Sequence, residues 1–435
     1  MGVHHHKTGL SDKNCLKFVH AADLHLDSPF IGVSEISTEL AGQLSSATFN
    51  AYEKIIDICI DNEVDFLLVS GDIYDSSDKS LYAQLKFVSG LKRLSAAGIR
   101  AYIVHGNHDP LSGWSASLSW PEHVHIMSGD TVECIPFESE GEIKAYIAGI
   151  SYPVQHVREN LAVKFPSKEK NWPFTIGLLH CTLGKGEGHE PYAACSEEDL
   201  VNTGYDYWAL GHIHIPSVVR EHSPAIIYAG NPQGRSTAEC GPRGCYLVSV
   251  GPDNEVNPVF VETGSVRWEV AEVSITDIGS EGELIDRISG CLSDIRSKSA
   301  GLPVVCRILL TGRGPMHMSL VKPGFSDDLI RHLRDDELNG SDFVLVERIV
   351  DNTGLLIERD RLGARKDFAG DIVNIVDDIR LQPGRLKELR ASLAPLINSA
   401  SGRRLIEEIS DEEFLEIISD GESLLLDRFV GSGEE

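Results

Sequence analysis

The chain has 435 residues, of which 42% are hydrophobic and 24% are charged, and its 66 acidic and 39 basic residues give a formal net charge of −27. The length predicts two or three domains, and the composition is typical of a soluble globular protein. No apolar run is long enough to span a bilayer. So acidic a chain is also a poor candidate for holding nucleic acid by itself, because phosphate binding normally uses clustered Lys and Arg.

The cysteines and the first residues indicate the compartment. Nine cysteines are scattered singly without a Cys-x-x-Cys pair, which favours reduced thiols over a disulfide framework or a zinc ribbon. The first ten residues lack the apolar stretch of a secretory signal. We therefore expect a cytoplasmic protein with no membrane partner.

Short apolar, β-rich segments alternate with helical patterns from about residue 16 to 265. Seven segments are predicted to be buried strands with their trailing loops, at 16–23, 64–72, 101–109, 143–150, 174–180, 207–212 and 225–232. Five of the seven end in His, Asp or Asn. Ligands of α/β sheets collect at the carboxyl ends of strands, so these polar residues lie where a site is expected.

Two further segments follow the first. Strand and helix patterns alternate from about 266 to 350, which predicts a small α/β domain. From about 368 to 435 the chain is expected to be helical and strongly acidic towards its end. Pro383-Gly384 should break this helical segment, and Ser410 with Glu413 forms the pattern of a capping box.

Five motifs at strand ends carry the candidate site: D-L-H (Asp23, His25), G-D (Asp72), G-N-H-D (Asn107, His108, Asp109), the lone His180, and G-H-I-H (His212, His214). Taken singly, each has a plainer explanation, such as a turn or a buried histidine. Together they supply carboxylates, imidazoles and one amide oxygen but no thiolate. That donor set suits Mn²⁺, Fe²⁺ or Zn²⁺ in an open catalytic site.

The donors are too many for one ion, whereas two ions sharing a bridging carboxylate would use them all. Two metals roughly 3.5–4 Å apart can stabilise both the attacking and the leaving oxygen of a phosphodiester and activate water. A positioned acid or base adds only about 10²–10⁴-fold. We therefore expect the metals to dominate the chemistry and a histidine to assist.

In this order the five motifs resemble those of the calcineurin-like metallophosphoesterase superfamily. A-D-L-H-L-D-S-P-F, G-H-E-P-Y-A and Y-D-Y-W-A-L-G-H-I-H are similar to its DNA-repair exonuclease branch, the SbcD-type nucleases. The resemblance covers about residues 16–265. It implies an α/β fold, a four-layer αββα sandwich of two sheets flanked by helices, with residues 266–350 as a capping domain.

The resemblance also implies roles. Asp23, His25 and His214 would bind the first metal, Asn107, His180 and His212 the second, and Asp72 would bridge both. His108 would stabilise the transition state or protonate the leaving oxygen, with Asp109 either orienting it or capping the following turn. Asp75 stands where some members of the superfamily carry a second non-ligand histidine.

Two more residues are candidate substrate contacts. His189 lies in the glycine-rich loop after His180, and Arg235 follows the strand segment 225–232 and could hold a phosphate in a bidentate manner. A surface position without such a role is the alternative for each.

The resemblance implies a Mn²⁺-dependent, 3′ to 5′ DNA exonuclease in DNA repair, a possible homodimer that works with an SMC-like ATPase. The acidic helical segment from about 385 to 430 could dock on that partner or pack on its own domain. A phosphodiesterase or pyrophosphatase acting on small molecules is the alternative enzyme, and a scaffold whose metals are structural is the alternative without catalysis.

Overall fold

The structure, a computed structural model, describes residues 16–28, 44, 46–75, 80–116, 118–184, 192–335, 342–356, 358–397 and 409–430. Contacts divide the chain into two compact units. The first comprises Met1–Val270, Ile295–Cys306 and Glu337–Glu347, and the second comprises Ala271–Asp294, Arg307–Asp336 and Arg348–Glu435. Each is described by itself. The domain boundaries expected near 265 and 350 stay predictions.

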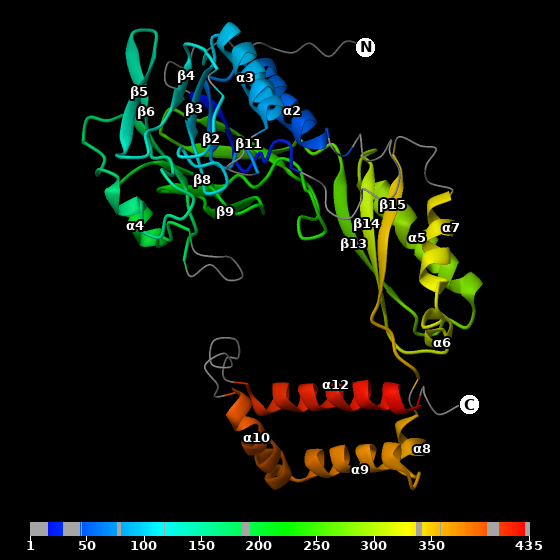
Figure 1. The fold of residues 1–435 in the computed structure, drawn as a ribbon. Helices are drawn as coiled ribbons and strands as arrows, with labels where there is room; N and C mark the ends of the chain where they lie inside the picture. Colours follow the sequence, from blue (N-terminus) through cyan, green and yellow to red (C-terminus); the bar gives the residue numbers. More distant parts are fainter. Residues whose placement is uncertain are drawn as a thin grey trace. The chain divides into compact units, whose positions relative to one another are not determined.

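Two six-stranded sheets form the first unit (Figure 1). The first sheet has the order β12-β11-β1-β2-β3-β4, with β1 (Leu16–Ala21), β2 (Phe66–Ser70), β3 (Arg100–Val104), β4 (Val124–Ile126), β11 (Gly244–Val250) and β12 (Val256–Glu262). The second has the order β5-β6-β7-β8-β10-β9, with β5 (Glu133–Ser139), β6 (Glu142–Gly149), β7 (Phe174–His180), β8 (Tyr207–Gly211), β9 (Ser217–Arg220) and β10 (Ala225–Tyr228). In both sheets the central strands are parallel.

All seven predicted strands are confirmed, as β1, β2, β3, β6, β7, β8 and β10. The other five strands that the structure describes in these two sheets were not predicted. Four of them, β4, β5, β9 and β12, are sheet edges, and β11 lies next to an edge. Edge strands are often short and half exposed, as β9 is, so their hydrophobic pattern is weak.

Successive side chains along each strand point to opposite faces of the sheet, and this alternation creates the layers of the sandwich. Phe18 on β1 and Phe66 on β2 face the second sheet, where they pack in one cluster with Tyr207 of β8. Their neighbours Val19 and Leu67 face the opposite side and pack in the cluster that includes α2 (Ala47–Asp61) and α3 (Leu81–Ala96).

A second outer layer covers the other sheet. It contains the short helices η1 (Ala162–Lys164) and α4 (Glu197–Val201), and Leu161, Phe165 and Leu200 pack there with Trp208 of β8. The predicted four-layer α/β sandwich is therefore confirmed. Its buried strands hold the ends of β1, β2, β3, β7 and β8 in fixed positions.

One buried histidine lies between the sheets without belonging to the candidate site. The Nδ1 atom of His20 is 3.0 Å from the Tyr207 hydroxyl, and its Nε2 atom is 3.0 Å from Ser70 Oγ. Burial lowers the pKa of His20 to about 3. The unfolded chain should bind a proton here near pH 6.5 whereas the folded chain does not, so His20 lowers stability as the pH falls below 6.5.

We expect the free energy of unfolding to fall by about 1 kcal/mol more in the wild type than in His20→Gln between pH 7 and pH 5.5. Urea titrations at both pH values, with EDTA present to remove any metal contribution, would measure the difference. Identical pH dependence in the two proteins would contradict the assignment.

A three-stranded sheet of order β13-β14-β15 follows, and its strands contribute residues to both units. The strands are β13 (Arg267–Ser274), β14 (Val304–Thr311) and β15 (Val344–Asp351), and the helices are α5 (Glu281–Lys298), α6 (His317–Leu320) and α7 (Phe325–Asp335). Within the first unit, Trp268 of β13 packs with Val305 and Leu345, and its indole N–H donates to Gly234 O at 2.9 Å. The alternating strand and helix pattern expected here is present.

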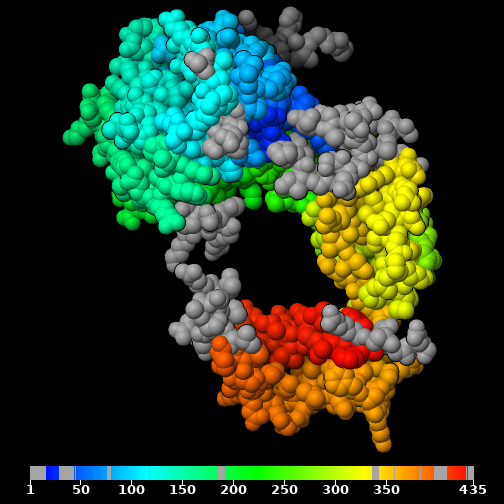
Figure 2. Space-filling view, viewed as in Figure 1, coloured from blue at the N-terminus to red at the C-terminus, as the bar shows by residue number. Residues whose placement is uncertain are grey.

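The rest of the described chain is helical, as expected. It comprises α8 (Arg359–Gly363), α9 (Phe368–Leu381), α10 (Pro383–Ile397) and α12 (Asp411–Val430), whose orange and red side chains form one mass in Figure 2. Pro383 ends α9 and opens α10. The capping box is present, since Glu413 N–H donates to Ser410 Oγ at 3.2 Å and Ser410 N–H to Glu413 Oε2 at 2.7 Å. None of the helices among the described residues combines the length and apolarity needed to cross a membrane.

Candidate metal centre

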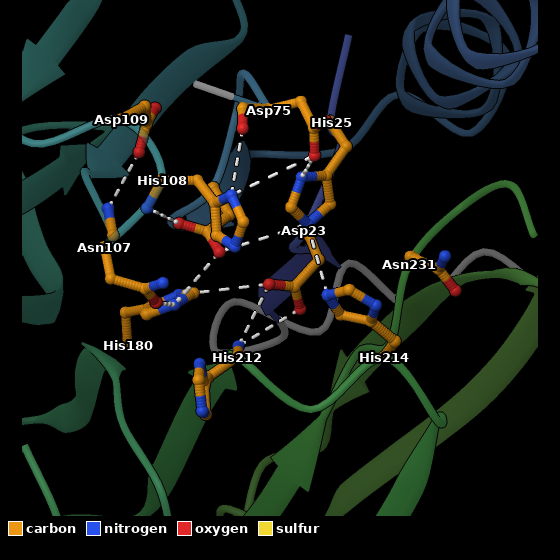
Figure 3. A network of polar contacts seen from close by, with 12 residues as sticks. Asp23, His25, Asp75, Asn107, His108, Asp109, His180, His212, His214 and Asn231 are labelled. Atoms are coloured by element: carbon orange, nitrogen blue, oxygen red, sulfur yellow. Dashed lines mark hydrogen bonds and ion pairs between the residues drawn. The ribbon is translucent and has the colours of Figure 1, made fainter. Parts of the chain in front are cut away.

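Five neighbouring strand ends deliver the predicted side chains to one place (Figure 3). They follow β1 (Asp23, His25), β2 (Asp72), β3 (Asn107, His108, Asp109), β7 (His180) and β8 (His212, His214). Backbone pairing beyond the strands holds the loops, because Asp23 N–H donates to Gly71 O and His25 N–H to Asp72 O, both at 3.0 Å. The carboxyl ends of the parallel strands thus form the site.

Two imidazoles face each other in the first half of the site. His25 Nε2 lies 3.1 Å from His214 Nε2, and the rings meet edge to face. Asp23 joins them in a group whose ligand atoms all lie within 4.8 Å of one another. Two ring nitrogens so close, beside a carboxylate, form a donor set that one divalent cation can occupy.

The second half of the site is centred on His180. Its Nε2 atom is 3.0 Å from Asn107 Oδ1 and 3.4 Å from Asp72 Oδ2, and its Nδ1–H donates to Ser70 O at 2.9 Å. The carbonyl contact places one proton on Nδ1, so Nε2, which faces the carboxylate, is the nitrogen available to a metal. Asp72 Oδ2 is also 3.9 Å from His25 Nε2, so Asp72 lies between the two halves, as a bridging ligand must.

His212 contributes through its backbone. Its N–H donates to both oxygens of Asp23, at 3.0 and 3.1 Å. Its ring stands nearly perpendicular to that of His180, at 5.2 Å between centroids, and contacts Tyr192. The ring is in none of the close ligand groups found among the described residues. A ligand role for His212 therefore stays a prediction.

The structure corrects the expected role of Asp109. The His108 ring donates from Nδ1 to the Asp75 carbonyl at 2.9 Å, and His108 N–H donates to Asp72 Oδ1 at 2.9 Å. Asp109 instead lies 2.9 Å from His105 Nδ1 and accepts N–H groups from Gly106 and Ile73. Asp75 orients His108, and Asp109 fixes the loop that carries it.

Without cations, the burial of Asp23 and Asp72 and the repulsion between their charges cost free energy. Asp23 and Asp72 are almost completely buried, and burial raises the pKa of Asp23, with Asp72 adding to the rise. Burial opposes ionisation of Asp72 as well, but His180 and His25 hold its pKa below the usual range. Buried carboxylates are normally paired or bind metal.

The histidines complete the test of whether metals fit. Burial lowers the pKa of His25 to about 4, which keeps its ring neutral and able to bind a metal at neutral pH. Burial would also lower the pKa of His180, but the charge of Asp72 outweighs it and raises the value to about 9. A proton on His180 therefore compensates the negative charge of Asp72, as a bound cation would do. The residues fit two divalent cations.

The backbone of the site is strained. The φ angles of Asp23, His25, Asp72 and His212 are 51°, 42°, 50° and 98°, in a region that residues with a Cβ rarely adopt. Strain of this kind costs of the order of 1–3 kcal/mol per residue and persists where the surrounding structure enforces it, which is common at functional sites.

Three residues outside the predicted ligand set shape the site. Asp75 Oδ1 is 2.9 Å from His25 Nδ1, Glu239 Oε1 is 2.6 Å from His214 Nδ1, and Arg243 donates to the His214 carbonyl. No motif in the sequence points to Glu239 or Arg243, whereas Asp75 lies within the motif G-D-I-Y-D.

The two predicted substrate contacts fare differently. Arg235 lies beside the metal ligands, but its guanidinium already contacts Asp75 at 2.8 Å and Glu239 at 3.1 Å. An arginine held by two carboxylates is poorly placed to bind phosphate, so the expected substrate contact is not supported. His189 lies outside the described residues.

Residues 16–216 match the family described as calcineurin-like phosphoesterase, and residues 268–354 match the middle domain of metallophosphoesterase YhaO. A protein of Bacillus subtilis named as the uncharacterized metallophosphoesterase YhaO is 38% identical over 338 residues, which cover 78% of this chain and 82% of that protein. The chain belongs to the calcineurin-like metallophosphoesterases. It is accordingly a hydrolase of phosphoester bonds.

Other metallophosphoesterases that resemble the chain are named as nucleases or repair proteins. The DNA double-strand break repair protein Mre11 of Methanocaldococcus jannaschii is 26% identical, with 63% of this chain and 74% of that protein covered. A Bacillus subtilis protein named as a subunit of the nuclease SbcCD is 24% identical, with 59% of this chain and 73% of that protein covered. Both matches are longer than the segment of this chain that contains the five ligand motifs.

Proposed function

We propose that this metallophosphoesterase is a two-metal DNA exonuclease, dependent on Mn²⁺ and acting 3′ to 5′ in DNA repair. The observation that carries the proposal is the pair of ligand groups, Asp23–His25–His214 and Asp23–Asp72–His180, at one edge of the sandwich. Two divalent cations held by these groups would supply Lewis-acid activation of the phosphodiester and of water.

His108 is the group proposed to move a proton. Its side chain is 42% exposed, whereas the ligand histidines His25 and His180 are buried. The Asp75 carbonyl can only accept, so it fixes the proton on Nδ1 of His108 and leaves Nε2 for the substrate. In the imidazolium form, Nε2–H can donate to the leaving oxygen.

The names of the relatives support DNA as the substrate, and the net charge of −27 favours the alternative. A small phosphodiester or a nucleotide pyrophosphate would fit the same ligand set and would require no basic surface. The YhaO relative, with its higher identity, is compatible with either substrate class. Only direct measurement on both substrates separates them.

We expect Mn²⁺-dependent shortening of an end-labelled duplex from its 3′ ends, with the rate lowered about 10²–10⁴-fold in His108→Ser. Both proteins would also be assayed on bis-p-nitrophenyl phosphate. His125→Ser is the control, because this histidine pairs with Glu133 instead of lying among the metal ligands.

Hydrolysis of the small diester with intact DNA, even after a candidate SMC-like ATPase is added, would refute the nuclease proposal and favour the small-molecule alternative. Equal activity of His108→Ser and the wild type on both substrates would refute the role of His108.

We propose a homodimer as well, formed through the exposed apolar side chains of α3 and of the loop between β3 and β4. Leu81, Tyr82 and Leu85 of α3 are 52%, 56% and 49% exposed, and Trp114 and Trp120 are 54% and 43% exposed. Large exposed apolar patches commonly mark interaction surfaces. Sedimentation equilibrium should show a dimer that Leu85→Glu converts to monomer, and a monomeric wild type would contradict it.

For the proposed SMC-like ATPase, the C-terminal helices offer a separate surface. Leu381 of α9 and Leu424 of α12 are 80% and 69% exposed, and acidic residues lie within four positions of each in the sequence. Copurification of an ATPase that is lost when residues 368–435 are removed would support this partner, and retention of the ATPase would contradict the docking role.

A further inference from the structure

One arginine connects the outer sides of both facing imidazoles. Arg235 Nη1 donates to Asp75 Oδ1 at 2.8 Å, and the same carboxylate oxygen lies 2.9 Å from His25 Nδ1. The contact joins residues 160 positions apart in the sequence. On this side, the chain of contacts runs from the guanidinium through a carboxylate to a predicted metal ligand.

The other side repeats the arrangement. Arg235 Nη2 donates to Glu239 Oε1 at 3.1 Å, and Glu239 Oε1 lies 2.6 Å from His214 Nδ1. The ring of contacts closes at the centre, where the two Nε2 atoms are 3.1 Å apart. Each imidazole therefore has a carboxylate on Nδ1 and faces the other imidazole with Nε2.

Arg235 and Glu239 are largely screened from water, and further hydrogen bonds hold Glu239. The side chains of Arg235 and Glu239 are 15% and 11% exposed, and Arg235 N–H also donates to Glu239 Oε2 at 2.7 Å. Asn231 Nδ2 donates to the same oxygen at 2.9 Å. The planar guanidinium can contact two carboxylates in fixed directions, which a lysine ammonium does less well.

A carboxylate on Nδ1 holds the proton there and leaves the Nε2 lone pair for a metal. Without the guanidinium between them, Asp75 and Glu239 would be two uncompensated carboxylates beside a site that already contains Asp23 and Asp72. They would turn towards solvent, and the imidazoles would lose their orientation.

We propose that Asp75, Arg235 and Glu239 form a bracket that sets the tautomer and the spacing of His25 and His214 for one divalent cation. Arg235 is a positioning residue that acts through the two carboxylates rather than a contact for the substrate phosphate. This inference rests on the proposed two-metal site. It also gives Asp75, where some relatives carry histidine, a defined task.

The test is Mn²⁺ binding to the purified full chain, measured by isothermal titration calorimetry and by electron paramagnetic resonance of the bound ion. In Arg235→Gln, we expect the affinity of one of two ions to fall about 10–100-fold while the other changes little. Arg235→Lys should weaken it less, because the charge remains. Arg267→Ala is the matched control, since Arg267 forms a similar ion pair with Glu262 and is 13% exposed.

Different results of the Mn²⁺ titration would contradict the bracket and the two-metal site on which it rests. Two ions bound by the wild type and by Arg235→Gln with equal affinity would overturn the bracket. A raised KM for bis-p-nitrophenyl phosphate with unchanged Mn²⁺ binding would overturn it in favour of a phosphate contact. Failure of the wild type to bind two ions would overturn the two-metal site and the bracket together. Thermal unfolding in EDTA would show whether each variant is folded. If Arg235→Gln is not folded, the same Mn²⁺ titration of Glu239→Gln tests the bracket.

Discussion

Asp72→Asn is expected to lower phosphodiesterase activity at least about 10³-fold and to reduce the number of Mn²⁺ ions bound at saturation below two. Asp72 belongs to the ligand group of Asp23 and His180, and its Oδ2 atom is 3.4 Å from His180 Nε2 and 3.9 Å from His25 Nε2 of the other group. Metal activation contributes several kcal/mol to such reactions, and each 1.36 kcal/mol is tenfold in rate. An amide keeps the shape of the side chain but removes its charge and one bridging oxygen.

The charge of Asp72 also controls its neighbour. Because Asp72 raises the pKa of His180 against the effect of burial, the asparagine variant should have a lower pKa at His180 than the wild type. The substitution therefore does not favour a surplus proton on that histidine.

Asp206→Asn is the matched control for this substitution. Asp206 precedes β8, at the end of the strand opposite to His212, and accepts hydrogen bonds from Lys168 at 2.5 Å and from Thr175 N–H at 2.7 Å. Its replacement should lower stability without changing metal stoichiometry, which mass spectrometry under native conditions and metal analysis would measure. Two bound ions and wild-type activity in Asp72→Asn would refute the bridging role.

Gly106→Ala is expected to abolish most metal binding and activity although it adds a single methyl group. A Cβ on Gly106 would collide with Asp72 Oδ1 and lie 2.8 Å from His180 Nε2. Both side chains are buried and held by other contacts, so neither can yield cheaply. The methyl group therefore displaces the Asp72 carboxylate or the His180 imidazole that faces it.

We expect Gly106→Ala to lower activity about 10²–10³-fold, which approaches the effect of Asp72→Asn. The melting temperature of Gly106→Ala in EDTA should be lowered as well. Gly290→Ala serves as control, because a Cβ in that position of α5 meets nothing within 4 Å and alanine favours a helix. Circular dichroism would show that both variants keep their secondary structure. A Gly106→Ala protein with unchanged Mn²⁺ affinity would contradict the described geometry.

The central strands and the place of the site could be predicted from the amino-acid sequence. Strands such as β2 and β7 are buried along their whole length and therefore mostly apolar, and this pattern is local. Since parallel strands gather their carboxyl ends at one edge, the residues that follow them could be assigned to one site from the order of the motifs alone. The same logic fails for β9 and the other edges, whose pattern is weak.

The contacts that hold those residues could not be predicted, because they join segments that are distant in the sequence. His25 and His214 are 189 positions apart, and Arg235 reaches Asp75 across 160. No period or motif encodes such pairs, because the folding of two sheets against each other creates them. For the same reason Asp109 could be assigned to His108 from proximity in sequence, although packing gives that histidine to the carbonyl of Asp75. The sequence shows which donor side chains are present, whereas the orientation of these side chains and their supporting contacts arise from the packing of distant segments.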